Sequence, residues 1–526
     1  MSVPEYTETP LDEIDLTYDR LNATFHSFKT LPIEYRLYNL KQLAFLIQDN
    51  IEAIYAALHK DLSKEPLDID VGDVWPILNE IELAVRRLPE WMADEKATRD
   101  SVLAFKLSRP HVRRQPKGVS LIIGAWNYPF QLTLSPLVGA ISAGCPAIIK
   151  CSEHSPASAA LIAELLPRYL DPEAYAVVNG AIPQSTALLK KRWGHILYTG
   201  NGAVGKIVAT AAAKTLTPST LELGGKSPTI VASDANITMI ARRMMSIKQL
   251  NIGQMCADPS LDEFYPKGSE RSLIGKHGQA AAFRNAGDYD RIEGIIDEAQ
   301  KGGKLIYRGE EDKPNRRMGI SLVRLNKDGA GETGILVEDE IWGPVLPIIP
   351  VDDVDAAIEY VNARPTPLAL YVCSAFRSTF EHVINRTLSG SAIWNDFSFA
   401  PVVRTLPFGG VGESGWGSYH GENGFLAFSH RKAVLEMPGW MEIAQKSRYP
   451  NNYVEGTHKR MKMVMTAPLG FSRPVSVEHE RRALERRRNR RTFYLGVLLV
   501  LVGAAAGLGG RRIASFLGGL KAKLGL

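Results

Sequence analysis

The spacing of apolar residues divides the chain into a helical N-terminal part and a part in which strands and helices alternate. Through residues 12–95, apolar side chains recur every three or four positions, which predicts amphipathic helices. From residue 118 onward, short apolar runs alternate with longer segments of helical periodicity. The predicted elements are strand 118–127, helix 134–144, strand 147–150, helix 155–170, strand 174–180, strand 195–200 and helix 203–214. This order is typical of a doubly wound parallel sheet in an α/β fold.

A second α/β stretch follows at about 225–395. Its apolar runs at 346–351 and 368–374 predict buried strands. The segment 406–421 is rich in glycine, so we expect a loop that turns sharply or approaches another part of the chain closely.

The last part of the chain has a different pattern. Residues 493–510 are uncharged and contain no proline, and as a helix they would be about 27 Å long. This length predicts a membrane span, with a buried core helix as the alternative. Arginine pairs on both sides favour the span; they are Arg490 with Arg491 and Arg511 with Arg512. More basic residues precede the run than follow it, which predicts that the body faces the cytosol.

Charge is distributed unevenly along the chain. The 526 residues carry a formal net charge of +5, but residues 481–526 hold eleven basic side chains and one acidic one. The remaining body is therefore slightly acidic. A nucleic-acid-binding protein needs a basic face on its folded body, so the charge argues against a nucleic-acid partner.

Four cysteines occur in the chain. No two of them form a C-x-x-C pair, and no histidine follows them at the sequence spacing that is typical of metal ligands. So few thiols in a long chain predict a reducing compartment, no disulfide framework and no metal site.

Four short segments contain candidate chemical groups: GAWNYPF at 124–130, ELGGKSP at 222–228, NIGQMC at 251–256 and EIWGP at 340–344. Each has an ordinary explanation when taken alone. A lone cysteine is more often a small buried apolar residue than a nucleophile. A glutamate beside two glycines is usually a loop carboxylate, and an asparagine after a strand usually caps or turns the chain.

Taken together and in this order, the segments resemble the aldehyde dehydrogenase superfamily, over about residues 20–450. The longer motifs YTGN-x-AVGK and LPFGGVG-x-SG-x-G-x-YHG resemble those of the class 3 branch, to which the fatty aldehyde dehydrogenases belong. A hydrophobic C-terminal tail is also a feature of that branch. The resemblance implies a Rossmann-like NAD-binding domain, an α/β catalytic domain, a bridging and oligomerisation element and a C-terminal transmembrane helix. The expected boundaries are 1–98 and 118–222 for the NAD-binding domain, 223–395 for the catalytic domain, 99–117 and 396–450 for the bridging element, 451–491 for a basic linker, 492–510 for the anchor and 511–526 for a basic tail.

The resemblance also implies catalytic roles. A thiolate adds to an aldehyde carbonyl, and the resulting thiohemiacetal passes hydride to NAD, which leaves a thioester. Cys256 matches the family's nucleophile. The amide of Asn127 and the backbone N–H of Cys256 would stabilise the oxyanion. Glu222 matches the base that activates water for hydrolysis of the thioester.

The cofactor site is implied in part by residues and in part by the resemblance. The residues Gly200, Asn201, Gly202, Ala203, Val204 and Gly205 spell G-x-G-x-x-G after a predicted strand and before a predicted helix, which indicates pyrophosphate at a helix N-terminus. Lys150 and Glu153 match the residues that hold the adenosine ribose. A carboxylate there repels a 2′-phosphate, which favours NAD over NADP. Residues Leu223, Gly224, Glu340 and Trp342 complete the expected contacts, with Glu340 on the nicotinamide ribose and Trp342 where the family usually has phenylalanine.

The resemblance is interrupted directly after Cys256. A family member continues there into an apolar strand and a helix, whereas here CADPSLDEFYP crosses this region without them, so that roughly twenty residues are absent. Either the chain has lost a strand of the catalytic domain or the sequence joins its coding segments incorrectly.

Three functions agree with these observations. The first is NAD-dependent oxidation of long-chain aldehydes by a membrane-anchored homodimer; the second is oxidation of an apocarotenal or another lipophilic aldehyde. The third, from a different class, is a membrane-tethered inactive scaffold, which the interruption after Cys256 suggests. The membrane would be that of the endoplasmic reticulum, peroxisome, lipid droplet or outer mitochondrial surface.

Overall fold

The computed structural model describes residues 3–99, 101–248, 250–254, 281–397, 403–442 and 476–486, with a few single positions between 449 and 473. The chain divides into two units, one of residues 1–97 with 111–435 and one of residues 98–110 with 436–526, and each is described by itself. Cys256 and the predicted span at 492–510 lie outside the described residues. Within the described part, no helix combines the length and the apolar composition that crossing a membrane requires.

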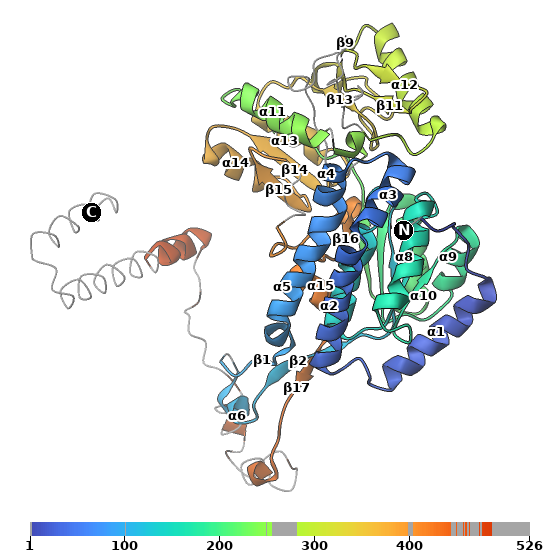
Figure 1. The fold of residues 1–526 in the computed structure, drawn as a ribbon. Helices are drawn as coiled ribbons and strands as arrows, with labels where there is room; N and C mark the ends of the chain where they lie inside the picture. The colour runs from blue at the N-terminus through green and yellow to red at the C-terminus, as the bar shows by residue number, and fades with distance from the viewer. Residues whose placement is uncertain are drawn as a thin grey trace, which may run out of the picture. The chain divides into compact units, whose positions relative to one another are not determined.

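The N-terminal periodicity folds into helices, as predicted. They are α1 (Leu11–His26), α2 (Ile33–Asp49), α3 (Ile51–Leu62), α4 (Pro66–Ile69), the π-helical turn η1 (Asp70–Val74) and α5 (Trp75–Met92). The long helices α2 and α5 pack against each other (Figure 1). Their apolar stripes are buried, with Leu43 on α2 and Ile81 on α5 as examples.

The predicted doubly wound sheet is present, with the strand order β16-β7-β6-β3-β4-β5. Its strands are β3 (Ser120–Ile123), β4 (Ala147–Lys150), β5 (Tyr175–Val178), β6 (His195–Gly200), β7 (Ser219–Leu223) and β16 (Gly415–Trp416). All neighbours pair in parallel except β16 and β7. The chain runs from β3 outward through β4 and β5, then returns to the other side of β3 with β6 and β7. Parallel sheets bind ligands at the carboxyl ends of the strands beside such a reversal.

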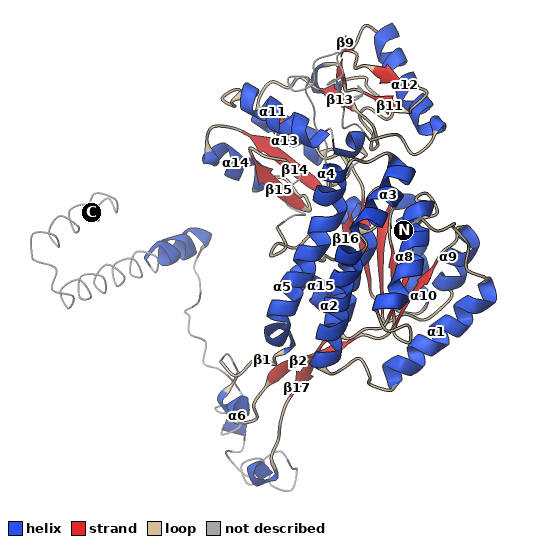
Figure 2. Ribbon diagram, in the orientation of Figure 1, coloured by secondary structure: helices blue, strands red, loops and turns tan. Residues whose placement is uncertain are grey.

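Helices cover both faces of this sheet (Figure 2). One core contains Ile122 and Ile149 with α2, α3, α5, α7 (Gln131–Ala143) and α8 (Pro156–Tyr169). The other core contains Leu121 and Ile148 with α1, α9 (Ile182–Leu189) and α10 (Gly202–Lys214). Successive strand residues therefore enter opposite cores, which explains why these strands read as continuous apolar runs.

The second α/β stretch forms two three-stranded sheets. The first, ordered β15-β14-β8, consists of β8 (Thr229–Val231), β14 (Ala369–Cys373) and β15 (Ser391–Trp394) in parallel. The second, ordered β13-β12-β9, consists of β9 (Leu305–Tyr307), β12 (Ser321–Arg324) and β13 (Val345–Ile348). The helices of this stretch are α11 (Ile237–Lys248), α12 (Ala286–Lys301), α13 (Val354–Asn362) and α14 (Arg377–Ile384), with the short turns η2 (Leu250–Gly253) and η3 (Lys327–Gly329) and the hairpin β10 (Glu311–Asp312) and β11 (Arg317–Met318).

One of the two predicted buried strands is confirmed. All of β14 is buried, as expected for the run 368–374. The expectation for 346–351 is wrong, because in β13 only Val345 is buried and Ile348 is 40% exposed. Among the described strands β13 pairs with β12 alone, so it lies at an edge of its sheet.

A three-stranded antiparallel sheet completes the first unit, in the order β1-β2-β17, with β1 (Glu95–Lys96), β2 (His111–Pro116) and β17 (Ser429–Val434). Before β17, the glycine-rich segment turns through η5 (Gly412–Ser414), β16 and α15 (Gly421–Ala427). Gly415 has φ 115° and a Cβ there would lie 1.8 Å from the Leu221 carbonyl oxygen, which confirms the predicted close approach. The second unit contains α6 (Leu103–Lys106), η6 (Gly439–Met441) and a helix at 477–486.

Candidate active site

Four strands of the central sheet end at the same edge, and the predicted site residues lie there. β3 ends beside β4 at the pair Ile123 and Lys150, and β6 ends beside β7 at the pair Gly200 and Leu223. These ends open onto a cavity of about 2250 Å³. The predicted site residues that line it are Asn127, Lys150, Glu153, Gly200, Asn201, Gly202, Ala203, Val204, Glu222, Leu223, Gly224, Glu340 and Trp342.

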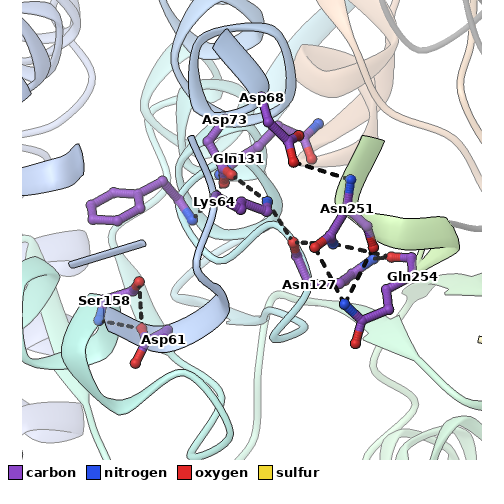
Figure 3. A network of polar contacts seen from close by, with 10 residues as sticks. Asp61, Lys64, Asp68, Asp73, Asn127, Gln131, Ser158, Asn251 and Gln254 are labelled. Carbon is purple, nitrogen blue, oxygen red and sulfur yellow. Dashed lines mark hydrogen bonds and ion pairs between the residues drawn. The ribbon is translucent and has the colours of Figure 1, made fainter. Parts of the chain in front are cut away.

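Asn127 lies in the loop between β3 and α7, and its side chain is buried. Its amide Nδ2 donates a hydrogen bond to the carbonyl oxygen of Gln254 at 3.1 Å. The side chain of Asn251 in turn donates to the carbonyl oxygen of Asn127, also at 3.1 Å (Figure 3). The structure thus joins the loop of Asn127 to the segment 251–254. Gln254 precedes Cys256 by two positions, and Cys256 itself lies outside the described residues.

The carboxyl group of Glu222 faces the cavity from the end of β7. It is buried, and within the described part of the chain neither of its oxygens has a hydrogen-bond partner. Burial raises the pKa of Glu222 well above its usual value, because the charged form loses its hydration. A carboxyl group with a raised pKa is a stronger proton acceptor, once ionised, than an ordinary glutamate.

The glycine turn lies between a strand and a helix, as predicted. β6 ends at Gly200, and the side chain of Asn201 caps α10 by accepting a hydrogen bond from the Val204 N–H at 2.9 Å. Gly205 does not line the cavity; it packs on β7, since a Cβ there would lie 2.6 Å from Leu223. A Cβ on Gly202 would meet no atom of the described chain within 4 Å. This open space lies in the cavity at the positive end of a helix, where an anionic group is stabilised.

Lys150 and Glu153 form an ion pair at the end of β4, with Nζ and Oε2 2.7 Å apart. Lys150 is buried and Glu153 is half-buried. Burial alone would raise the pKa of Glu153, but the hydrogen bond from Lys150, a backbone hydrogen bond and the nearby positive charges together outweigh burial and lower that pKa. Glu153 is therefore ionised at neutral pH and faces the cavity as a negative charge.

Glu340 approaches the chain after β7 so closely that it requires a glycine there. A Cβ on Gly224 would lie 1.7 Å from Oε2 of Glu340. Oε1 of Glu340 is buried without a hydrogen-bond partner within the described residues. Burial raises the pKa of Glu340 to about 7. Trp342 lies two residues further on, and its ring is 5.8 Å from that of Trp126, also on the cavity wall.

These features fit a dinucleotide. The open space at Gly202 has room for a pyrophosphate. Oε1 of Glu340, which has no partner among the described residues, and the ionised Glu153 could accept hydrogen bonds from ribose hydroxyl groups. Across the ranges that the structure describes, no cluster of three histidine, cysteine, aspartate or glutamate side chains is arranged to hold a metal ion.

Sequence reasoning missed the residues that support Asn127. Lys64, Asp68 and Asp73 are buried and contact the loop of Asn127 or the segment 251–254. They lie within residues 12–95, for which the apolar periodicity predicts amphipathic helices, and in that pattern the charged positions of KEPLDIDVGD would be expected on a solvated face. No signal in the sequence alone distinguishes these buried positions from solvated ones.

Three of the four cysteines are described: Cys145, Cys151 and Cys373 are buried. Burial raises the pKa of Cys145, and it raises the pKa of Cys151 and Cys373 to about 12. Their thiolates are strongly disfavoured at neutral pH, so all three are packing residues and poor nucleophiles.

Comparison with known proteins agrees with this geometry. The sequence profile of the aldehyde dehydrogenase family matches residues 2–434. The chain is 41% identical to aldehyde dehydrogenase family 3 member A2 of Mus musculus, over 82% of this chain and 90% of the relative. It is 37% identical to the dimeric NADP-preferring aldehyde dehydrogenase of Canis lupus familiaris, over 85% and 100%. A solved structure of Staphylococcus aureus AldH in a substrate-bound state superposes with a TM-score of 0.75 at 30% identity, over 83% and 99%. The chain therefore belongs to the class 3 branch of the aldehyde dehydrogenase family and is an aldehyde-oxidising oxidoreductase with that family's α/β fold.

Proposed function

We propose that this protein oxidises long-chain aldehydes to carboxylic acids with NAD, through a thioester on Cys256. The observation that carries the proposal is the convergence on one cavity of the amide of Asn127, the buried carboxyl group of Glu222 and the open turn at Gly202. An amide donor, a base and an anion site are the parts that covalent aldehyde oxidation needs besides a thiol.

In the first step the thiolate of Cys256 adds to the aldehyde carbon and places a negative charge on the carbonyl oxygen. Nδ2 of Asn127 and the backbone N–H of Cys256 donate hydrogen bonds to that oxygen. The Gly202 turn would hold NAD, which would supply the acceptor for the hydride that leaves the same carbon, so that a thioester would remain on Cys256. Cys256 is favoured as the nucleophile because the other three thiols are buried and have raised pKa values.

In the second step Glu222 removes a proton from water, and the resulting hydroxide attacks the thioester carbon. The carboxylic acid leaves, and the thiolate of Cys256 is restored. Burial, without a hydrogen-bond partner in the described part of the chain, prepares Glu222 for this role, because it raises the affinity of the carboxylate for a proton.

Lys150, Glu153 and Glu340 would hold the cofactor, and the charge of Glu153 favours NAD. A 2′-phosphate beside an ionised carboxylate is repelled, whereas a 2′-hydroxyl donates a hydrogen bond to it. The dog relative is named NADP-preferring, so the preference of this chain needs its own measurement. We expect kcat/KM to be higher with NAD than with NADP, and Glu153→Gln to reduce the ratio of the two values.

A lipophilic substrate is supported by the apolar part of the cavity wall, which includes Trp126, Leu132, Ile240 and Met244. A long alkyl chain gains about 0.8 kcal/mol for each methylene that it buries. We propose a fatty aldehyde, with an apocarotenal as the second candidate. Comparing kcat/KM for hexadecanal, an apocarotenal and butanal separates the three possibilities.

The proposal is tested by mixing protein that lacks residues 492–526 with hexadecanal and NAD and measuring NADH by its absorbance. NADH together with hexadecanoic acid supports the proposed oxidation. A folded protein that binds NAD but forms no NADH with any aldehyde would instead indicate the inactive, membrane-tethered scaffold.

We further propose that residues 492–510 anchor the enzyme in a membrane with its catalytic body in the cytosol, and that the body is a homodimer. The name of the dog relative describes a dimeric enzyme. A lipophilic substrate dissolved in a membrane explains why an anchored enzyme would be useful. Sedimentation of the tail-less body tests the dimer.

A further inference from the structure

The chain between α3 and α5 contains three buried charged side chains that belong to no step of the proposed reaction. They are Lys64, Asp68 and Asp73, and each is less than 7% exposed. Burying a charge is unfavourable unless partners replace its hydration. The position of these partners is therefore informative: apart from the pair that Lys64 and Asp73 form with each other, they lie at residues 127–131 and at Asn251 (Figure 3).

The ammonium group of Lys64 has three partners. Nζ lies 3.0 Å from Oδ2 of Asp73, donates a hydrogen bond to the carbonyl oxygen of Asn127 at 2.8 Å and lies 3.7 Å from the centre of the Tyr128 ring. The side chains of Lys64 and Asp73 are fully buried. A charge-assisted hydrogen bond between buried groups is stronger than one between neutral groups, so Lys64 holds this carbonyl group firmly.

The two aspartates extend this contact to both loops. Oδ1 of Asp73 accepts hydrogen bonds from the backbone N–H groups of Phe130 and Gln131, where α7 begins. Oδ2 of Asp68 accepts one from the backbone N–H of Asn251. In an α-helix, residues five apart point about 140° away from each other, and the wider π-helical turn at η1 reduces this angle. The turn thus allows Asp68 and Asp73 to serve neighbouring loops.

The loop of Asn127 and the segment 251–254 are also joined directly. Asn127 accepts a hydrogen bond from the side chain of Asn251 and donates one to Gln254. In this segment Asn251 and Ile252 have φ values of 51° and 43°. A β-branched residue rarely adopts a positive φ, and such strain persists only where the surroundings fix the backbone. The contacts from Asp68 and Asn127 provide that fixation.

We propose that Lys64 is a positioning residue for aldehyde oxidation: together with Asp73 it holds the main chain of Asn127 so that the amide of Asn127 keeps the orientation that oxyanion stabilisation requires. This inference rests on the role of Asn127 in the proposed function. A purely structural role explains the contacts less well, because buried ion pairs contribute little net stability compared with apolar residues of the same size. Displacing a catalytic group by about 1 Å, by contrast, slows a reaction about a hundredfold.

The test measures the first-order rate constant of NADH formation in the first turnover, at saturating NAD and hexadecanal. This constant does not depend on the fraction of protein that is folded, whereas the amplitude of the first turnover does. The variant Lys64→Met with Asp73→Asn removes both charges of the ion pair, so that Asp73 is not left as a buried carboxylate without its cation. Asp73→Asn alone is the milder variant, because its side-chain oxygen still accepts from Phe130 and Gln131. Both are also made in an Asn127→Ala background.

Arg36→Met is the matched control. Arg36, on α2, is also a buried cation. Its guanidinium donates a hydrogen bond to the carbonyl oxygen of Ser142 at 2.9 Å, near the C-terminal end of α7, whereas Asp73 contacts the N-terminal end of that helix. Its loss should reduce the melting temperature and leave the first-turnover rate constant within about twofold of the parent.

In the parent, we expect the double variant to reduce the rate constant at least about tenfold, and Asp73→Asn to reduce it less. In the Asn127→Ala background, we expect both changes to alter the rate constant less than about twofold. An unchanged rate constant with a lower amplitude would overturn the positioning role, as would equal effects in both backgrounds. If the double variant does not fold, the same outcomes for Asp73→Asn decide. No effect of Asn127→Ala itself, or no NADH from a parent that is folded and binds NAD, would instead overturn the proposed function on which the inference rests.

Discussion

At the scale of single residues, Glu222 combines burial with the absence of a hydrogen-bond partner among the described residues. An ionisable group in this state costs stability, because folding removes its hydration and returns nothing. Proteins retain such groups where chemistry needs a shifted pKa. The same reasoning applies to Glu340, whose carboxyl group is displaced from its usual pKa mainly by burial.

Replacing the proposed base should separate the two halves of the reaction. In Glu222→Gln the thiol still adds and NADH still forms once, but water attacks the thioester slowly because nothing removes its proton. We expect a burst of NADH followed by a steady rate at least about a hundredfold below that of the parent. Cys256→Ala should show neither phase. If Cys256→Ala kept more than a few per cent of the activity, the assignment of the nucleophile would be wrong.

The raised pKa of Glu340 predicts that NAD binding depends on pH. An ionised carboxylate can accept hydrogen bonds from both ribose hydroxyl groups. In the protonated form one oxygen carries a hydrogen and acts as a donor, so it is a poorer acceptor. With a pKa of about 7 in the free enzyme, ionisation rises between pH 6 and pH 8, so the Kd for NAD should fall about tenfold over this range.

Titration calorimetry of the parent and of Glu340→Gln measures this effect. The variant should bind NAD more weakly, with a Kd that is nearly independent of pH. A parent Kd that does not change between pH 6 and pH 8 would show that Glu340 is not a ligand of the cofactor.

At the scale of elements, the site depends on the loops at the carboxyl ends of the central strands. β7 carries Glu222 near its end, and the chain after this strand passes two glycines and meets Glu340 from a segment more than a hundred residues away. The close approach is possible only because Gly224 has no side chain. Its neighbour Gly225 has more room, since a Cβ there would meet no atom nearer than 3.9 Å.

These two glycines provide a matched pair of variants. Gly224→Ala places a methyl group where Oε2 of Glu340 now lies, so the carboxylate must move and the KM for NAD should rise about tenfold, equivalent to the loss of one hydrogen bond to a charged group. Gly225→Ala should change the KM less than about threefold. Equal effects of the two substitutions would mean that the loop as a whole is intolerant, and that Glu340 is not the reason.

The elements that could be predicted from the sequence are those specified by local pattern. Strand β4 and helix α10 have apolar periodicity and a capping asparagine within a few residues, and the structure forms both. The edge position of β13 could not be predicted, because it depends on which strands pair with it. The role of Lys64 could not be predicted either, since its hydrogen-bond acceptor at residue 127 is 63 positions away. Burial of a charge is a property of the assembled fold, which a local pattern does not contain.

At the scale of the whole chain, the resemblance to the family is interrupted after Cys256, and the α/β stretch at about 225–395 that contains this interruption is divided into separate sheets. Apart from the hairpin of β10 and β11, the described strands of this part form two separate sheets, and β8 and β13 each pair with one described strand only. A strand of the kind that family members carry after the catalytic cysteine needs such an edge for its backbone hydrogen bonds. Removing an interior strand and its helix costs far more than the roughly 5–15 kcal/mol by which a domain is stable.

We therefore expect that the transcript encodes roughly twenty more residues after Cys256, the length of a strand with a short helix. Protein made from the present sequence should be poorly folded or much less active than protein with the longer segment. Sequencing the transcript and recording thermal unfolding with and without NAD provide the measurements. A short transcript whose protein unfolds cooperatively, is stabilised by NAD and oxidises aldehydes would contradict this expectation.

The C-terminal part makes a separate prediction about location. A fluorescent protein fused to residues 481–526 should go to a membrane, because eighteen uncharged residues flanked by arginines favour insertion over solution. Deletion of 492–526 should release the enzyme into the soluble fraction. Replacing Leu498 and Leu499 by arginine in the fusion is the control, and it should abolish the membrane signal. Diffuse fluorescence from the unmodified fusion would contradict the anchor.

The contacts of Lys64 and Asp68 also set the time at which the site is completed during synthesis. The ribosome adds about 5–20 residues per second, so Asn127 emerges about 3–13 s after Lys64, and Asn251 about 9–37 s after Asp68. During these intervals Lys64, Asp68 and Asp73, which are buried in the folded protein, must remain hydrated in the nascent chain. The N-terminal helices therefore cannot reach their final packing before residue 251 has arrived. A chain arrested between residues 214 and 251 contains the glycine turn but lacks the contacts of Asn127 with Asn251 and Gln254.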